Sequence, residues 1–234
     1  HPLKKNAKLE AGLKTIFSKT DNDVLWQNYT VNTWVNDLVK TNHFIYEENI
    51  LAAYINYSKT IKKLSVETGL RAEQTFTTGT SLTLNTAVKN EYLNFFPNIG
   101  FSYEASKKHQ WGLNYRKSIE RYGFDFVNPF IVYQSQYTYS QGNPYLLPQI
   151  DHNFEISHSY NYQLFSSVSY THSVKALAPV YKQDAVTNLL VSSYDNLGTS
   201  DMLVAIVTLN KVLFKKWTSV NSLGGFYINY DIRG

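Results

Sequence analysis

The feature that most constrains this sequence is a period-2 alternation of apolar and polar residues that continues over unusually long segments. In residues 152–162, apolar, aromatic or His side chains occupy every second position, and Asn, Glu or Ser lie between them. Residues 110–120 and 64–73 show the same pattern, and helical periodicity is nearly absent. Alternation of this kind predicts β-strands with one apolar face and one polar face.

Less regular alternation predicts further strands, so we expect about nine in all, most of about 10–14 residues. They are expected at residues 7–17, 47–59, 64–73, 93–105, 110–120, 152–162, 164–174, 201–213 and 217–230. Strands of globular proteins usually have about 5–6 residues, whereas a tilted strand that crosses a bilayer needs about 9–11. The strand length therefore favours an all-β, antiparallel transmembrane barrel.

The predicted connections alternate between short and long. Short turns are expected near residues 61–63, 106–109, 161–163 and 214–216. Long connections are expected at residues 18–46, 75–92, 121–150 and 175–200. A transmembrane β-barrel has short periplasmic turns and long external loops, whereas long structureless loops are uncommon in compact domains. The asymmetry is the one that a barrel predicts.

The composition agrees with strands that have one lipid-facing and one wet face. The chain has 19 Tyr, 13 Phe and 4 Trp but only 17% charged residues, against about a quarter in soluble domains. No segment approaches the roughly 18 apolar residues of a transmembrane helix, and the first residues lack the apolar region of a signal peptide. Several rings lie beside the short turns, as in the aromatic girdle of a barrel; they are Tyr54, Tyr57, Tyr103, Trp111, Tyr160, Tyr162, Phe214 and Trp217.

Several function classes are disfavoured by the same sequence. Lys and Arg number 22 and Asp and Glu 18, a net charge of +4, and the lysines lie in scattered doublets, so no nucleic-acid surface is expected. Cysteine is absent and the six His residues are dispersed, so we expect no metal site. We find no nucleophile elbow, phosphate loop or zinc-helix motif. The chain is therefore expected to be no enzyme and to hold no cofactor.

The charged residues of the predicted strands fall on the polar face. We interpret them as lumen charges, paired across strands and wetted by the barrel interior. A glycosidase pair among the carboxylates is the alternative, and we favour the lumen interpretation. The residues are Glu67, Arg71, Glu73, Arg116, Glu120 and Glu155.

One predicted external loop carries a proline-containing motif, Asn-Pro-Phe followed by a Tyr-rich stretch and then Gly-Asn-Pro-Tyr-Leu-Leu-Pro. Proline fixes φ and Gly142 admits a positive φ, so we expect the motif to hold the loop in a fixed shape over the barrel mouth. Its structural residues are Asn128, Pro129, Phe130, Gly142, Asn143, Pro144, Leu146 and Pro148.

Aromatic residues of the external loops are the candidate ligand contacts. Aromatic rings stack on the faces of sugars and chelates and recur at binding surfaces. The candidates are Trp26, Tyr29 and Trp34 on one loop, and Tyr133, Tyr137 and Tyr139 on another.

The motif in residues 128–148 resembles the outer-membrane β-barrel family related to TonB-dependent receptors, in which both elements lie on one external loop. The resemblance runs from about residue 3 to residue 230. A departure occurs at Tyr122, where the family often has a proline directly after the arginine. Other segments that agree, in order, are Leu9–Lys14, Ala52–Lys59, Gly69–Glu73 and Tyr92–Pro97.

The resemblance implies the C-terminal barrel region of a larger protein in the outer membrane of a Gram-negative bacterium. We expect residues 1–234 to form a single partial barrel domain, truncated, with the plug and the N-terminal domains absent. The implied function is uptake of a small nutrient. The implied partners are outer-membrane lipid, the TonB energy-coupling system through the absent N-terminal parts, and a surface lipoprotein. Two alternatives remain open, namely a soluble all-β carbohydrate-binding or adhesion domain and a structural barrel without transport.

Overall fold

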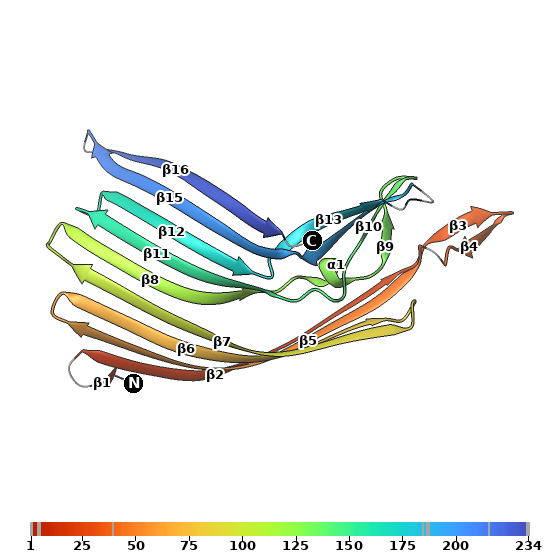
Figure 1. Ribbon diagram of the computed structural model, residues 1–234, viewed down its shortest axis with the longest axis horizontal. Coiled ribbons are helices and arrows are strands. Elements are labelled where there is room, and N and C mark those ends of the chain that lie inside the picture. Colours follow the sequence, from red (N-terminus) through yellow and green to blue (C-terminus); the bar gives the residue numbers. More distant parts are fainter. Residues whose placement is uncertain are drawn as a thin grey trace.

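The main body of the structure is one ten-stranded antiparallel sheet, seen in a computed structural model that describes residues 2–3, 6–38, 40–183, 185, 188–214 and 216–232. The strands lie in the order β1-β2-β5-β6-β7-β8-β11-β12-β15-β16 (Figure 1). Their bounds are β1 (Pro2–Leu3), β2 (Ala7–Val24), β5 (Asn42–Ile61), β6 (Leu64–Ser81), β7 (Thr86–Glu104), β8 (His109–Glu120), β11 (Gln149–Tyr160), β12 (Leu164–Val174), β15 (Gly198–Leu213) and β16 (Trp217–Ile232). Sequence neighbours are therefore neighbours in the sheet.

All nine predicted strands are present, and the tenth, β1, has only two residues. β8, β11 and β12 have the expected length, at 11–12 residues, whereas the other six long strands have 16–20 residues and continue further at the end opposite the short turns. The connection expected at residues 75–92 is wrong, since β6 and β7 fill it except for residues 82–85. This extension is rich in Thr, Ser and Asn on both faces. It therefore lacks the apolar alternation from which a strand is recognised, although the backbone ladder continues.

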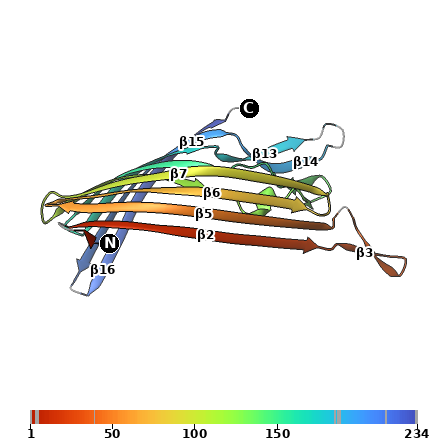
Figure 2. The ribbon, with the colours of Figure 1, turned by 90° about the horizontal axis from the view of Figure 1, so that it is seen from below.

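The sheet is curved and open (Figures 1 and 2). Within the described residues β16 pairs only with β15, and β1 pairs only with β2. The fold is thus a partial barrel.

The cross-strand register separates a polar face from an apolar face. One row on the apolar face reads Ile99, Tyr115, Phe154, Tyr170, Leu203 and Tyr227. Large side chains of this face are open to the surroundings, with Leu13 86% and Leu223 79% exposed. The loop of residues 121–148 lies against the other face. We call the polar, loop-covered face the inner face and the apolar one the outer face.

The aromatic residues near the short turns divide between the two faces. Tyr57, Tyr103 and Trp111 lie on the outer face, as a girdle requires. Tyr54 is register partner to Gly12 and Arg71 and lies on the inner face instead. Because Tyr54 and Tyr57 are three residues apart on one strand, they cannot share a face.

The long connections carry secondary structure of their own. A four-stranded sheet of order β13-β14-β10-β9 combines β9 (Ile131–Tyr133), β10 (Thr138–Gln141), β13 (Leu177–Gln183) and β14 (Leu190–Asn196). A hairpin of β3 (Gln27–Thr30) and β4 (Thr33–Asn36) extends beyond β2 and β5 (Figure 1). The short helix α1 (Phe124–Val127) begins the loop after β8. Among the described residues, no helix has the length and hydrophobicity to cross a membrane.

The two faces predict opposite responses to a charge at neighbouring positions of β8. Leu113 lies on the outer face and is 52% exposed, while Asn114 lies on the inner face beside Glu155. Leu113→Arg in the full-length parent protein should cost about 2–4 kcal/mol of folding free energy in lipid vesicles, because it places a cation in hydrocarbon. Asn114→Arg is the control and should cost much less. Denaturant titration of vesicle-inserted protein measures both, and equal costs would contradict the assignment of the faces.

Candidate functional site at the external mouth

The loop after β8 is attached to the inner face by one arginine. Arg121 Nη2 donates hydrogen bonds to Glu73 Oε2 at 2.7 Å and to Thr75 Oγ1 at 3.1 Å, both on β6. Its Nε lies 3.7 Å from Glu48 Oε1 on β5. Arg71 Nε completes the cluster at 3.0 Å from Glu73 Oε1. Two cations and two carboxylates thus balance in a half-buried cluster that joins β8 to strands two and three places away.

Burial and hydrogen bonding act in opposite directions on Arg121. Burial alone would lower the pKa of its guanidinium, but hydrogen bonds to Glu73 and Tyr92 raise that pKa above its ordinary value. The next residue, Tyr122, has its pKa raised to about 12 by burial and by the carboxylates of Glu120 and Asp151. Arg121 therefore stays charged and Tyr122 neutral at physiological pH.

The loop after β8 also packs on the main sheet through a small apolar core. Phe44 on β5 is 1% exposed and contacts Val127 and Leu146 of the loop, which are 7% and 6% exposed. Asn42 Nδ2 also donates to Asn128 Oδ1 at 3.5 Å. The loop is therefore seated over the ends of β5 to β7, at the mouth of the barrel.

Gly142 is required by close packing. Its N–H donates to Asn128 O at 3.0 Å, and the Asn143 N–H donates to Phe126 O at 2.7 Å. A Cβ on Gly142 would overlap Asn128 O and lie only 2.8 Å from Phe126 O. Gly142 does not use the positive φ that glycine admits, since among the described glycines only Gly198 has one.

The other motif residues make local turn contacts. Asn128 Oδ1 accepts from the Phe130 N–H, and Pro129 O accepts from Gln141 Nε2. Asn143 Nδ2 donates to Tyr194 O on β14 at 3.1 Å, which joins the motif to the four-stranded sheet. Pro144 and Pro148 line a narrow space between the loop and Tyr92. The structure thus brings the two halves of the motif together.

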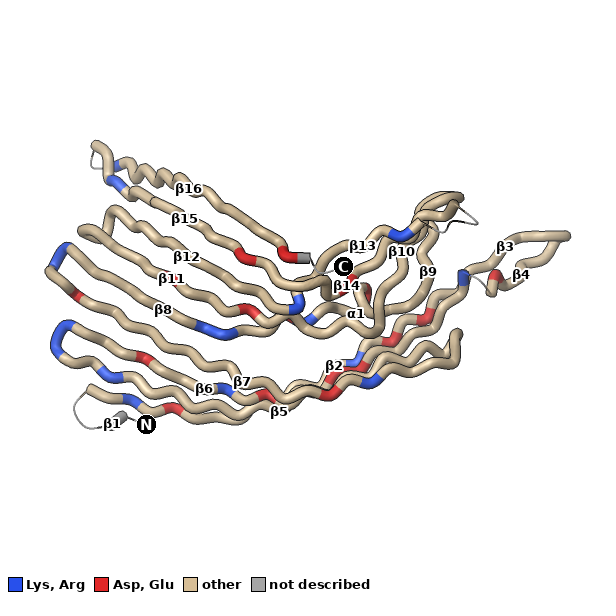
Figure 3. The backbone as a smooth tube through the Cα atoms, viewed as in Figure 1, with Lys and Arg blue, Asp and Glu red and all other residues tan. Residues whose placement is uncertain are grey.

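The predicted lumen charges share the inner face but are not all close together. Glu67, Arg71 and Glu73 lie along β6, Arg116 and Glu120 on β8, and Glu155 on β11. Pairing across strands is found for Glu73, through Arg121, whereas Arg71 contacts Glu73 along the same strand. Figure 3 shows that acidic and basic residues are sparse and intermixed along the strands.

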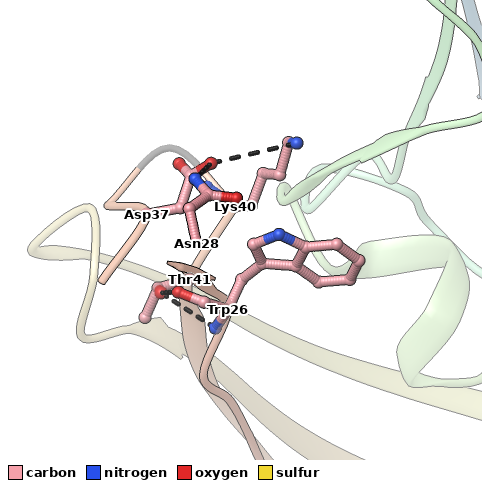
Figure 4. A network of polar contacts seen from close by, with 5 residues as sticks. All are labelled: Trp26, Asn28, Asp37, Lys40 and Thr41. Carbon is pink, nitrogen blue, oxygen red and sulfur yellow. Dashed lines mark hydrogen bonds and ion pairs between the residues drawn. The ribbon is translucent and has the colours of Figure 1, made fainter. Parts of the chain in front are cut away.

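The aromatic candidates of the first loop lie on the projecting hairpin. The Tyr29 and Trp34 rings are 5.1 Å apart, and these side chains are 59% and 64% exposed. Trp26 lies at the base of the hairpin, where its backbone N–H donates to Thr41 Oγ1 and Lys40 Nζ lies 5.4 Å from the indole ring (Figure 4). Asp37 ties Lys40 and Asn28 together beside it.

The tyrosine candidates lie on the four-stranded sheet. The Tyr133 and Tyr139 rings are 6.0 Å apart, and Tyr139 is also register partner to Val191. Val191 lines a cavity of about 670 Å³ between this sheet and the ends of β5 to β7, but neither Tyr133 nor Tyr139 is among the residues that line it. Tyr137 is 67% exposed at the start of β10. Within the described residues, no ring contact joins these tyrosines to the hairpin aromatics.

The cavity is lined by side chains that sequence reasoning missed. Lys182 and Asp195 belong to its polar lining, and the rings of Tyr145 and Tyr194 line it as well. Sequence reasoning also missed the anchoring role of Arg121, Glu48 and Tyr92. The available signal was an arginine directly at the end of a predicted strand, beside a motif that needs attachment. The described residues contain no cluster of three or more potential metal ligands.

A comparison with models of known protein families identifies the family of this barrel. The chain matches the outer membrane protein beta-barrel family over residues 1–234. It belongs to that family. The protein is therefore an outer-membrane β-barrel of a Gram-negative bacterium, and the soluble all-β alternative is wrong. A comparison with curated protein sequences finds no significant match.

Solved structures of low sequence identity share the fold. The copper transporter OprC is 9% identical with a TM-score of 0.72, over 96% of this chain and 36% of OprC. The ferric-catecholate import receptor Fiu from E. coli K12 is 12% identical with a TM-score of 0.60, over 96% and 35%. The FrpB iron transporter from Neisseria meningitidis is 14% identical with a TM-score of 0.54, over 79% and 26%. This family member thus resembles TonB-dependent receptor barrels and spans about a third of the structures that it matches.

Removing the arginine anchor should loosen the loop. Arg121→Ala leaves Glu73 and Glu48 half-buried without their shared cation, which should cost about 1–3 kcal/mol. Amide hydrogen exchange in residues 121–148 of the full-length protein should accelerate accordingly. Arg116→Ala, on the inner face of the same strand, is the control. Unchanged exchange in the Arg121 variant would show that the apolar core alone holds the loop.

The tight contact at Gly142 predicts a large difference between two glycines of the same loop. Gly142→Ala forces the Cβ against Asn128 and Phe126 and should destabilise the loop by about 1–3 kcal/mol. Gly123→Ala should be tolerated, because no atom lies within 4 Å of the Cβ it would add. Limited proteolysis in the outer membrane compares the two variants, and equal cleavage would contradict the close-packing argument.

Proposed function

We propose that this chain is part of the wall of an energised outer-membrane transporter whose external loops select a small nutrient. The observation that carries the proposal is the Arg121-anchored loop. It seats a folded structure over the barrel mouth and leaves a cavity of about 670 Å³ beneath the four-stranded sheet. Ligand pockets commonly have about 300–1,000 Å³. A barrel with a purely structural role has no need of a shaped cavity at its mouth.

The proposed transporter depends on parts beyond this region. We infer that residues 1–234 form one domain of the parent protein, that a plug occupies the lumen, and that coupling to TonB runs through the N-terminal parts. A surface lipoprotein is a further proposed partner at the external loops. We also infer that the protein is no enzyme, because the inner-face carboxylates that the structure describes serve charge balance or face the lumen.

Uptake measured in cells tests this function. A strain that lacks the parent gene should lose accumulation of one ligand class among radiolabelled Cu(II), a ferric catecholate and a maltodextrin mixture. Deletion of the coupling protein TonB should give the same loss, and the intact gene should restore uptake. Unchanged accumulation of all three probes, with normal envelope integrity, would favour another ligand. A fragile envelope with no transport defect would favour the structural barrel.

The two aromatic sets can be tested separately once a ligand is identified. Replacing Tyr133, Tyr137 and Tyr139 by alanine should weaken binding by about 2- to 12-fold for each ring that stacks on the ligand. A second variant replaces Trp26, Tyr29 and Trp34. Tyr162→Ala, in a short turn at the opposite end of the barrel, is the control. Full affinity in both triple variants would remove these rings from the proposed site.

A further inference from the structure

The wall of the barrel is interrupted between β7 and β8. The two strands pair only from Asn98 opposite Arg116 to Glu104 opposite Gln110. β7 nevertheless continues beyond this point in register with β6, and β8 continues to Glu120 in register with β11. The two strands diverge there in Figure 1. We call this unpaired stretch, residues 93–97 facing residues 117–120, the seam.

The outer face of the seam carries exposed apolar side chains. On its β7 side, Leu93 and Phe95 point to the outer face and are 55% and 50% exposed. On its β8 side, Ile119 lies on the same face as its partner Ile150. Unpaired backbone groups are costly in hydrocarbon, where no water is available to pair with them. The seam therefore requires a polar partner that is itself compatible with the bilayer.

The lumen side of the seam is covered. Arg121 crosses behind it to reach β6, and Tyr122, Leu146 and Pro148 lie against the inner face of β7 near Tyr92. A partner for the seam must therefore approach from the lipid side. The seam is therefore a binding site on the lipid side of the barrel wall and is closed toward the lumen.

On the outer face the charge at the seam is positive, whereas the carboxylate of Glu120 lies on the inner face of the seam. Lys117 is the register partner of outer-face His152 on the neighbouring strand, and its Nζ lies 6.0 Å from the ring centroid of Phe96, which is buried on the inner face of β7. His152 Nδ1 is 3.0 Å from Tyr115 Oη, and Nε2 makes no hydrogen bond within the part of the chain that the structure describes. Within the described residues Lys117 forms no ion pair. Arg116 lies at the same end of the seam on the inner face.

We propose that the seam binds an anionic lipid of the bilayer. Its phosphate oxygens accept hydrogen bonds from Lys117, from His152 and from the unpaired backbone N–H groups. Its acyl chains lie along Leu93, Phe95 and Ile119. The site rests on the membrane location of the barrel and is independent of the transported ligand.

Cysteine cross-linking tests whether the seam is open in a membrane. Continuing the register would place Phe95 opposite Ile119, so Phe95→Cys with Ile119→Cys should fail to form a disulfide if the seam is open. The control pair, Ile99→Cys with Tyr115→Cys, occupies the same type of position four residues away in the paired ladder and should cross-link readily. This chain has no cysteine of its own. Equal cross-linking of both pairs in the full-length protein would overturn the seam.

Lipid selectivity tests the occupant. A fluorophore on Phe95→Cys in the full-length protein, in vesicles of phosphatidylcholine and phosphatidylglycerol, reports the local lipid through quenching by brominated chains. Preference for brominated phosphatidylglycerol should fall about fivefold in a Lys117→Gln background, the factor expected for one lysine at an anionic surface. Lys211→Gln, on the outer face of β15 beside the short turn that leads to β16, should leave the lipid preference unchanged. An equal preference with and without Lys117 would overturn the lipid site.

Discussion

A strand that crosses a bilayer must pair its backbone groups with neighbouring strands, because hydrocarbon offers no other partner. The main sheet follows from this constraint. Nine long strands run antiparallel in sequence order, and all neighbours except β7 and β8 are in continuous register over most of their length. Pairing in register also aligns the alternating side chains of neighbouring strands, so that one face of the sheet is apolar and the other is polar. The lipid-facing band and the polar interior are two consequences of the same ladder.

The external mouth depends on a different interaction. Above the apolar band the strands no longer bury one face in lipid, and side chains must organise the loops. Arg121 does so by reaching across β7 to Glu73 and Glu48, and the small core around Phe44 completes the attachment. A charge-balanced cluster suits this place, since it holds the loop firmly while its surroundings stay partly wet. The cavity beneath the four-stranded sheet exists because the loop is fixed in this position.

The seam between β7 and β8 is where the two organising principles meet. The backbone ladder between them stops at Asn98 and Arg116, and directly after β8 Arg121 reaches its carboxylates on the other side of β7. Attachment of the loop thus coincides with an interruption of the wall. The positive side chains and the apolar rims at that point are complementary to a lipid with an anionic head group.

The sequence alone determined the nine long strands, the two faces and the family, because alternation is local and each long strand carries its own copy of it. Only the tertiary structure decided the strand ends, since Thr and Asn in residues 75–92 alternate in no recognisable way. It also decided the inner position of Tyr54, the reason for Gly142 and the role of Arg121. These depend on residues about 14 to about 73 positions apart in the chain, which meet only when the sheet has formed. No local sequence pattern predicts contacts between residues so far apart, because they form only when the strands have paired.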